Sequence, residues 1–225
     1  MVLNKIKNIV ISKKNMTAKN KEFWEWRCFF YDEKFKETIT NKIKINLPQP
    51  IHRQYTDEYI ITSDILYNIK LRKSNSNILE KLHIKKIIET SNSMYKFSSK
   101  IIVPFPISKK HIFELEKIGI SGIRKDTRDI ASFREDINQS SKETFLTSVK
   151  KEITLYSIKK RYSGLKKKIR FEISDINIKN KFMHTISLKC ISKEIIAETL
   201  NKFEIDDLGG TDYISFIKKL TRVKR

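Results

Sequence analysis

Apolar and polar residues alternate strictly along several segments of this chain. Across residues 22–30, both tryptophans and Cys28 occupy one parity, whereas Glu25 and Arg27 occupy the other. A period of two is that of a β-strand, which points successive side chains to opposite faces. Similar alternation, or runs of β-branched and aromatic residues, predicts further strands at 56–62, 66–72, 81–87, 154–162, 166–173 and 184–191. Most of these strands carry basic residues on one face.

Helical spacing of apolar residues is less frequent. It predicts amphipathic helices at 108–119, 127–137 and 192–203, and a last short helix at 213–220, after Gly209 and Gly210. Turn residues at 73–77, 163–164 and 177–181 separate the strands. Strands at hairpin spacing with helices between and after them predict an α+β protein, an antiparallel β-barrel or tunnel of about eight strands with flanking helices.

Length and composition fit one folded domain. The 225 residues include 13 Phe, 8 Tyr and 2 Trp, which supply a core that a disordered polyelectrolyte lacks. We expect the domain to span residues 21–221, with basic tails at 1–20 and 222–225, the first being a tail or an incorrectly assigned start. With 5 Gly and no G-x-G-x-x-G or G-x-x-x-x-G-K motif, dinucleotide-binding and P-loop proteins are excluded.

Cysteine usage and hydropathy predict a cytoplasmic protein. Cys28 and Cys190 lie far apart in sequence, which favours two reduced thiols over a zinc site or a disulfide. The longest apolar runs are about five residues, far below the roughly 20 that a membrane helix needs, so no membrane span is expected. The first 20 residues lack the apolar core of a secretory signal. The sequence does not indicate an oligomeric state.

The charge is strongly positive. There are 47 Lys+Arg against 26 Asp+Glu, which gives a net charge of +21. Part of the lysine excess can reflect a general bias of this sequence toward Lys, Ile and Asn. A surplus of this size should nevertheless attract polyanions, whether nucleic acid, polyphosphate, nucleotides or anionic lipid. Charge alone does not choose among these partners.

The basic residues recur at equivalent strand positions. A charged strand face ordinarily faces solvent in an antiparallel sheet. A solvent face would more often mix uncharged polar residues with both signs of charge. A ring of inward-facing cations would instead hold several phosphates at once. The candidates are Arg27, Lys70, Arg72, Lys85, Lys159, Arg161 and Arg170, with Glu25 and Glu172 among them.

These residues, in order, resemble the CYTH superfamily, the triphosphate tunnel proteins. The similarity rests on EWR at 25–27, DEY at 57–59, NIKLR at 68–72, LHIK at 82–85, the basic strand at 159–161, RFE at 170–172, TISL at 185–188 and GGTDYISFIKKL at 209–220. It covers residues 22–220. The resemblance implies a closed antiparallel β-tunnel that binds a triphosphate and, in active members, hydrolyses it with a divalent metal such as Mg²⁺ or Mn²⁺.

When positions are matched to the family pattern, the resemblance implies that Glu25 and Glu172 are the carboxylates that hold the metal. It implies that the seven basic candidates bind the phosphates. The chain departs from the family pattern at two positions. Phe23 stands where the E-x-E-x-K signature requires a glutamate, and Lys189 stands at an acidic position of a later strand. Two remaining carboxylates can suffice for Mg²⁺, so triphosphatase activity stays open and no catalytic residue is assigned.

Other site types are disfavoured. The four histidines have no partner at metal-ligand spacing, although His83 shares the parity of Lys85 and could face a lumen. The parity of Cys28, Trp24 and Trp26 favours packing beneath helices over a nucleophile or a base-stacking surface. Three hypotheses remain: a metal-dependent phosphohydrolase of tripolyphosphate or an organic triphosphate, a non-catalytic tunnel for polyphosphate or nucleotides, and, less favoured, an RNA-binding β-domain with an open charged platform.

Overall fold

The structure is a computed structural model that describes residues 22–47, 49–74, 77–98, 100–124, 127, 129–140, 144–162 and 164–222. The predicted tail at 1–20 and residues 223–225 of the predicted C-terminal tail lie outside these ranges. No helix in the described ranges has the length and hydropathy needed to cross a membrane.

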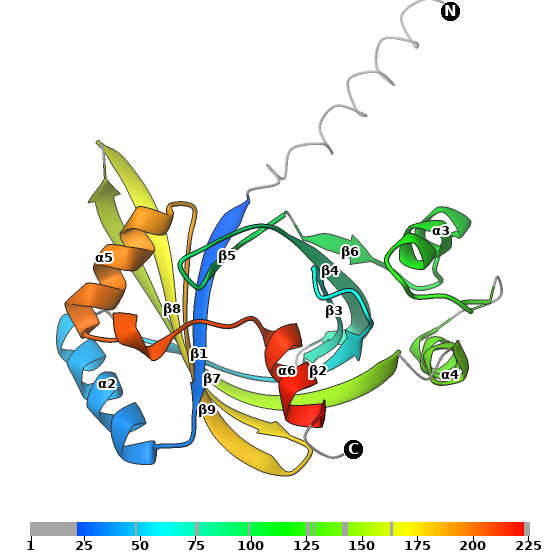
Figure 1. The fold of residues 1–225 in the computed structure, drawn as a ribbon, viewed down its shortest axis with the longest axis horizontal. Coiled ribbons are helices and arrows are strands. Elements are labelled where there is room, and N and C mark those ends of the chain that lie inside the picture. The colour runs from blue at the N-terminus through cyan, green and yellow to red at the C-terminus, as the bar shows by residue number, and fades with distance from the viewer. Residues whose placement is uncertain are drawn as a thin grey trace, which may run out of the picture.

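Eight antiparallel strands form a closed ring (Figure 1). Around the ring they run in the order β3, β2, β7, β8, β9, β1, β5, β4, and the pairing of β3 with β4 closes it. The ninth strand, β6, adds to β4 beside β5. The strands are β1 (Phe23–Phe30), β2 (Ile51–Ile61), β3 (Tyr67–Ser74), β4 (Asn77–Ser91), β5 (Met94–Phe97), β6 (Ile101–Val103), β7 (Phe145–Tyr162), β8 (Leu165–Ile178) and β9 (Lys181–Cys190). The predicted barrel is confirmed.

Helices cover the ring on two opposite sides. Figure 1 shows α2 and α5 against one side and α3 and α4 against the other. The helices are α2 (Glu33–Asn46), α3 (Lys109–Lys117), α4 (Ile130–Ser140), α5 (Lys193–Phe203) and α6 (Tyr213–Arg222), with a short 3₁₀ turn η1 (Asp206–Leu208). The four predicted helices correspond to α3 to α6.

The sequence pattern did not predict α2 and the short strands β5 and β6. Phe35, Ile39 and Ile43 recur every four residues along α2, and all three pack in the core. Asp32 caps this helix by accepting a hydrogen bond from the Phe35 N–H. The segment contains two threonines and three isoleucines. Their β-branched side chains lower helix propensity, so the composition does not favour a helix even though the spacing does.

The apolar faces of the strands point outward, toward the helices. Trp24, Trp26 and Cys28 of β1 are buried in one cluster with side chains of α2 and α5. Ile69 and Leu71 of β3 are buried in a second cluster with side chains of α3 and α4. Cys28 is 4% exposed and is a core residue, as predicted, and its burial raises the pKa of the thiol to about 12. The polar strand faces are therefore left to line the inside of the ring.

Helix α6 fills one end of the ring. Tyr213, Ile214 and Ile217 pack with inward-facing residues of β2, β7, β8 and β9 in a third cluster. Asp212 caps α6, since its carboxylate accepts hydrogen bonds from the N–H groups of Ile214 and Ser215. The Thr211 N–H donates to the Arg27 carbonyl at 2.7 Å, which fastens the approach to α6 onto β1.

Gly210 sets how closely this approach lies to β1. A Cβ at this position would lie 2.2 Å from the Ser93 carbonyl oxygen and 2.8 Å from Cδ1 of Trp26. We expect Gly210→Ala to destabilise the fold by about 1–3 kcal/mol in urea denaturation, because the backbone must move to relieve the overlap. Hydrogen exchange of the α6 amides should become faster.

Gly164→Ala is the matched control, because nothing lies within 4 Å of the corresponding Cβ in the β7–β8 turn. The positive φ of Gly164 makes this substitution destabilising as well, but the hydrogen exchange of the α6 amides should stay at the wild-type rate. Unchanged α6 protection in Gly210→Ala would contradict the proposed close fit.

Candidate functional site

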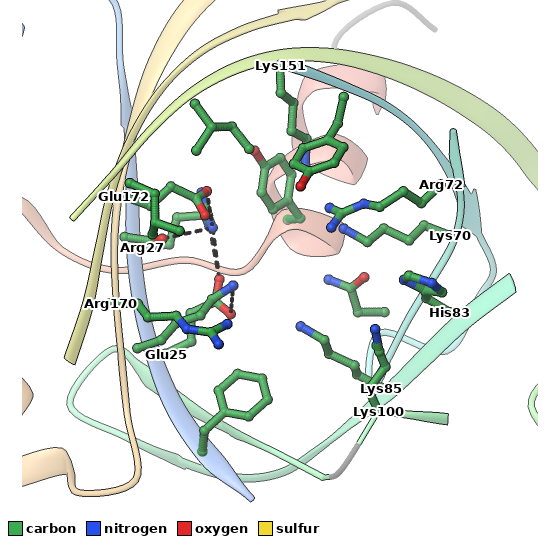
Figure 2. Close-up of a pocket in the computed structure, with 18 of the residues that line it drawn as sticks. Glu25, Arg27, Lys70, Arg72, His83, Lys85, Lys100, Lys151, Arg170 and Glu172 are labelled. Carbon is green, nitrogen blue, oxygen red and sulfur yellow. Dashed lines mark hydrogen bonds and ion pairs between the residues drawn. The ribbon is translucent and has the colours of Figure 1, made fainter. Parts of the chain in front are cut away.

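The polar interior of the barrel is a pocket of about 630 Å³. Figure 2 shows two facing walls: Lys70, Arg72, His83, Lys85 and Lys100 on one side, and Glu25, Arg27, Arg170 and Glu172 on the other. Among the residues that the structure describes, eleven lysines and arginines line it, against two glutamates; the cations are Arg27, Arg53, Lys70, Arg72, Lys85, Lys100, Lys151, Lys167, Lys168, Arg170 and Lys189. Such an excess of cations in a cavity predicts an anionic ligand.

The first wall comes from β3 and β4. The pairing of Lys70 with His83 brings their inward-facing positions side by side. Burial and the charges of Lys100, Lys70 and Arg72 lower the pKa of His83 to about 3, so its imidazole is neutral at pH 7. Burial, together with nearby cations, lowers the pKa of Lys85 to about 7. Burial and then neighbouring cations also lower the pKa of Lys70 and Lys100, so this wall holds its amines away from water and close to like charges.

A fully buried carboxylate lies behind this wall. Asp57 has no exposed side-chain surface and contacts three cations. Its Oδ2 lies 2.8 Å from Lys70 Nζ and 2.9 Å from Lys151 Nζ, and its Oδ1 accepts a 2.7 Å hydrogen bond from Arg72 Nε. Burial alone would raise the pKa of Asp57, but these cations hold it well below its ordinary value. Asp57 therefore fixes three pocket cations in place.

The second wall is an ion-pair network centred on Arg27. Its Nη2 lies 3.1 Å from Glu25 Oε1 and 3.2 Å from Glu172 Oε1. Its Nη1 donates a hydrogen bond of 3.0 Å to Thr185 Oγ1 of β9, and its Nη2 donates one of 3.0 Å to Ser187 Oγ of the same strand. Burial opposes ionisation of both glutamates, but Arg27 and Lys189 lower the pKa of Glu172 to about 2 and that of Glu25 further. Both carboxylates are charged and paired.

Tyrosines line the pocket toward α6. The rings of Tyr59 and Tyr213 stack at 5.1 Å, and Lys151 Nζ lies 3.8 Å from the centre of the Tyr213 ring. Lys151 also donates to the Tyr59 hydroxyl at 2.7 Å. The Tyr213 hydroxyl is buried and has no hydrogen-bond partner among the residues that the structure describes. A buried unpaired hydroxyl is costly unless a ligand or water satisfies it.

The structure brings together seven of the nine predicted site residues. Glu25, Arg27, Lys70, Arg72, Lys85, Arg170 and Glu172 all line the pocket. Lys159 and Arg161 do not line it and are exposed. The pairing of β7 with β2 ends at Leu155, and that of β8 with β9 ends at Arg170. The outer part of the β7–β8 hairpin therefore extends beyond the ring, so alternation alone does not make a residue face the pocket.

Several pocket residues were not predicted. Lys151 has the parity of Lys159 on β7, so extending that alternation toward the N-terminus would have found it. Asp57 lies in the DEY segment, whose burial the pattern did not reveal. His83 lines the pocket, which the shared parity with Lys85 had left open. Lys100 precedes β6 and has no periodic signal. The remaining unpredicted cations are Arg53, Lys167, Lys168 and Lys189.

The donor set does not fit a divalent metal held by the protein. Glu25 and Glu172 do meet, as the resemblance implied, but the Arg27 guanidinium lies between them. The other oxygen of Glu25 lies 3.1 Å from Lys189 Nζ. Within the described ranges, no three His, Cys, Asp or Glu side chains are grouped so that they could hold a metal ion. A metal here would have to displace two cations that already pair with its ligands.

Comparisons with known proteins support the fold. No family model and no curated protein matches the sequence. Among solved structures, the PH1012 protein from Pyrococcus horikoshii OT3 is similar with a TM-score of 0.50 and 15% identity, covering 85% of this chain and 98% of that one. HpAC1 from Hippeastrum, named as a candidate adenylyl cyclase with a dominant triphosphatase activity, has a TM-score of 0.51 and 10% identity, covering 88% and 95%. These similarities support the expected fold, a closed antiparallel β-barrel with flanking helices, and they show the fold alone.

Asp57 offers a test of the network behind the first wall. Asp57→Asn removes the negative charge and leaves Lys70, Arg72 and Lys151 facing one another. Removing one partner of a buried ion pair costs about 3–5 kcal/mol, and we expect a loss of that order in the free energy of unfolding, measured by urea denaturation.

Glu58→Gln is the matched control. Glu58 is the next residue of β2 and pairs with Arg134 at 2.7 Å, but both side chains are partly exposed. A surface pair of this kind contributes about 1 kcal/mol or less. Equal losses of stability in the two variants would contradict the role of Asp57 as the buried counterion.

Proposed function

We propose that the protein binds the triphosphate or polyphosphate group of a small molecule in the barrel pocket. The observation that carries this proposal is the convergence of eleven cations on one cavity, whose described lining contains two glutamates as its acidic residues. Each phosphoryl unit of such a ligand offers oxygens that accept hydrogen bonds from lysine and arginine, and several units in a row need cations on several sides. A ring of strands supplies them.

The shape of the pocket favours binding of the terminal phosphates of a ligand. Helix α6 fills one end of the ring, so a ligand inserts its phosphates from the other end. The unpaired hydroxyl of Tyr213 would donate to the innermost phosphate. Exposed Arg170 and Lys168 lie toward the open end, where the organic part of a ligand would remain. The pocket therefore recognises phosphates and leaves the organic group unspecified.

Hydrolysis of the bound ligand is the second candidate. It is favoured by the similarity of fold to HpAC1, which is described as having a dominant triphosphatase activity. The basic side chains would neutralise the charge that spreads over a transferring phosphoryl group during attack by water. Release of phosphate from tripolyphosphate and nucleoside triphosphates, measured with and without Mg²⁺ or Mn²⁺, tests this activity separately from binding.

An RNA-binding platform is the less favoured alternative. Lys70, Arg72 and Lys85 face the inside of a closed ring, which a folded RNA helix is too wide to enter. Calorimetric titration with tripolyphosphate and with single-stranded RNA that lacks a 5′-triphosphate distinguishes the two ligands. Tighter binding of such RNA would reverse this ranking.

Two arginines of the same hairpin test the pocket as the binding site. Arg170→Gln removes a pocket cation, and we expect tripolyphosphate affinity to fall about tenfold, because a hydrogen bond to a charged group contributes about 1.5 kcal/mol or more. Arg161→Gln makes the same change at an exposed position outside the pocket lining. We expect its affinity to stay within about twofold of wild type. Equal losses of tripolyphosphate affinity in the two variants would mean that Arg161 belongs to the binding site, as the sequence pattern suggested.

Proton uptake is a second signature of binding in the pocket. In the free protein, burial and the charges of Lys189, Arg72 and Arg27 lower the pKa of Lys85 to about 7, against the pull of Glu25. A bound polyanion favours the charged amine and raises this pKa. Binding at about pH 8 should therefore take up part of a proton, and affinity should fall as the pH rises above about 7.

Calorimetry in two buffers of different ionisation enthalpy measures this uptake. Lys85→Arg keeps the positive charge but stays protonated throughout, so it should take up less than wild type at the same pH. Lys70 and Lys100, whose pKa values are also lowered, are present in both proteins, as is the titration of the ligand itself. Equal proton uptake by the two proteins would mean that Lys85 is not part of the binding site.

A further inference from the structure

The two glutamates of the pocket are already neutralised by the protein. Arg27 is almost fully buried, with 3% of its side chain exposed, and its Nη2 lies within 3.2 Å of an oxygen of each glutamate. Its Nε donates to Glu25 Oε1 at 3.1 Å. The geometry of the guanidinium thus gives both carboxylates the positive partner that a bound metal ion would otherwise supply.

Neighbouring groups hold this arrangement in place. Thr185 and Ser187 of β9, both fully buried, accept the remaining hydrogen bonds of the Arg27 guanidinium. Lys189 of the same strand contacts the second oxygen of Glu25 at 3.1 Å. Register fixes these contacts, because Glu25 pairs with Lys189 and Arg27 pairs with Ser187 across β1 and β9. The network is built by the sheet and does not depend on a flexible loop.

The opposite wall supplies the charge that a polyphosphate needs. Lys70, Arg72 and Lys85 come from β3 and β4, and the lining of that wall contains no carboxylate among the described residues. Asp57 lies behind these cations and is not part of the lining. A ligand between the walls meets cations on both sides. An additional divalent ion would raise the positive charge of a cavity that already lowers the pKa of Lys85.

We propose that the pocket takes its polyphosphate ligand as the metal-free anion, with Arg27 and Lys189 occupying the carboxylates at which a divalent metal would bind. This inference rests on the proposed function. It gives one of the two departures from the family pattern a physical meaning, since Lys189 replaces a carboxylate and supplies a cation beside Glu25.

Calorimetric titration of the full chain with tripolyphosphate, in EDTA and in excess Mg²⁺, tests the inference. We expect binding in EDTA at least as tight as in Mg²⁺, because Mg²⁺ neutralises the same phosphate oxygens that the lysines and arginines contact. Tightening of about threefold or more on addition of Mg²⁺ would overturn the inference and leave the proposed function standing. Failure to bind in either condition would overturn both.

A variant of Lys189 gives an independent readout. Lys189→Glu adds a carboxylate beside Glu25 and removes a cation, so affinity in EDTA should fall about tenfold or more, one charged contact being lost. Mn²⁺ should then bind the variant, as measured by electron paramagnetic resonance, whereas wild type should bind none in the pocket. Wild-type affinity in EDTA and no gain of Mn²⁺ binding would overturn the role of Lys189.

Lys181→Glu is the matched control. It makes the same change of charge on the same strand, but Lys181 begins β9 at the β8–β9 turn and is exposed outside the pocket lining. Its affinity in EDTA and its lack of Mn²⁺ binding should match those of wild type. Thermal unfolding of all three proteins shows whether each is folded under the conditions of the titration. An equal effect in Lys181→Glu would mean that net charge, and not the Arg27 network, governs binding.

Discussion

Mutual repulsion of cations inside a closed ring is the constraint on which the rest of this structure depends. Closing the sheet forces the polar faces of β1 to β4 and of β7 to β9 to share one cavity. Like charges that are close together and partly removed from water destabilise the fold unless opposite charges lie beside them. Three carboxylates provide the balance: Asp57 behind one wall, and Glu25 and Glu172 in the other. An anionic ligand would neutralise the positive charge that these carboxylates leave uncompensated.

The apolar parts of the molecule make this interior possible. Trp24 and Trp26 on one side, and Ile69 and Leu71 on the other, are buried outside the ring under helices. Inside the ring, a third apolar cluster lies at the end filled by α6. The hydrophobic stabilisation thus comes mainly from the outer faces of the sheet, which leaves the middle of the barrel available for charge. The pocket is separated from these two outer clusters by the thickness of one strand.

Period-two alternation predicted the barrel and most of the pocket because it fixes which face a side chain occupies. It placed Glu25, Arg27, Lys70 and Arg72 correctly, and it predicted burial of the tryptophans. It could not show where the ring ends, so Arg161 was included although its part of the hairpin extends beyond the ring. It also could not show ion pairing across strands. The position of Arg27 between two glutamates depends on register between β1, β8 and β9, which no local pattern contains.

A crystal structure of the full chain with tripolyphosphate would show directly where the anion lies. We expect electron density for the phosphates between the two walls, with oxygens in hydrogen-bond distance of Lys70, Arg72 or Lys85 and of Arg170, while Arg27 keeps its contacts with Glu25 and Glu172. Phosphates bound only on the outside of the barrel, with the interior unchanged, would contradict the claim that the enclosed cations form the ligand site.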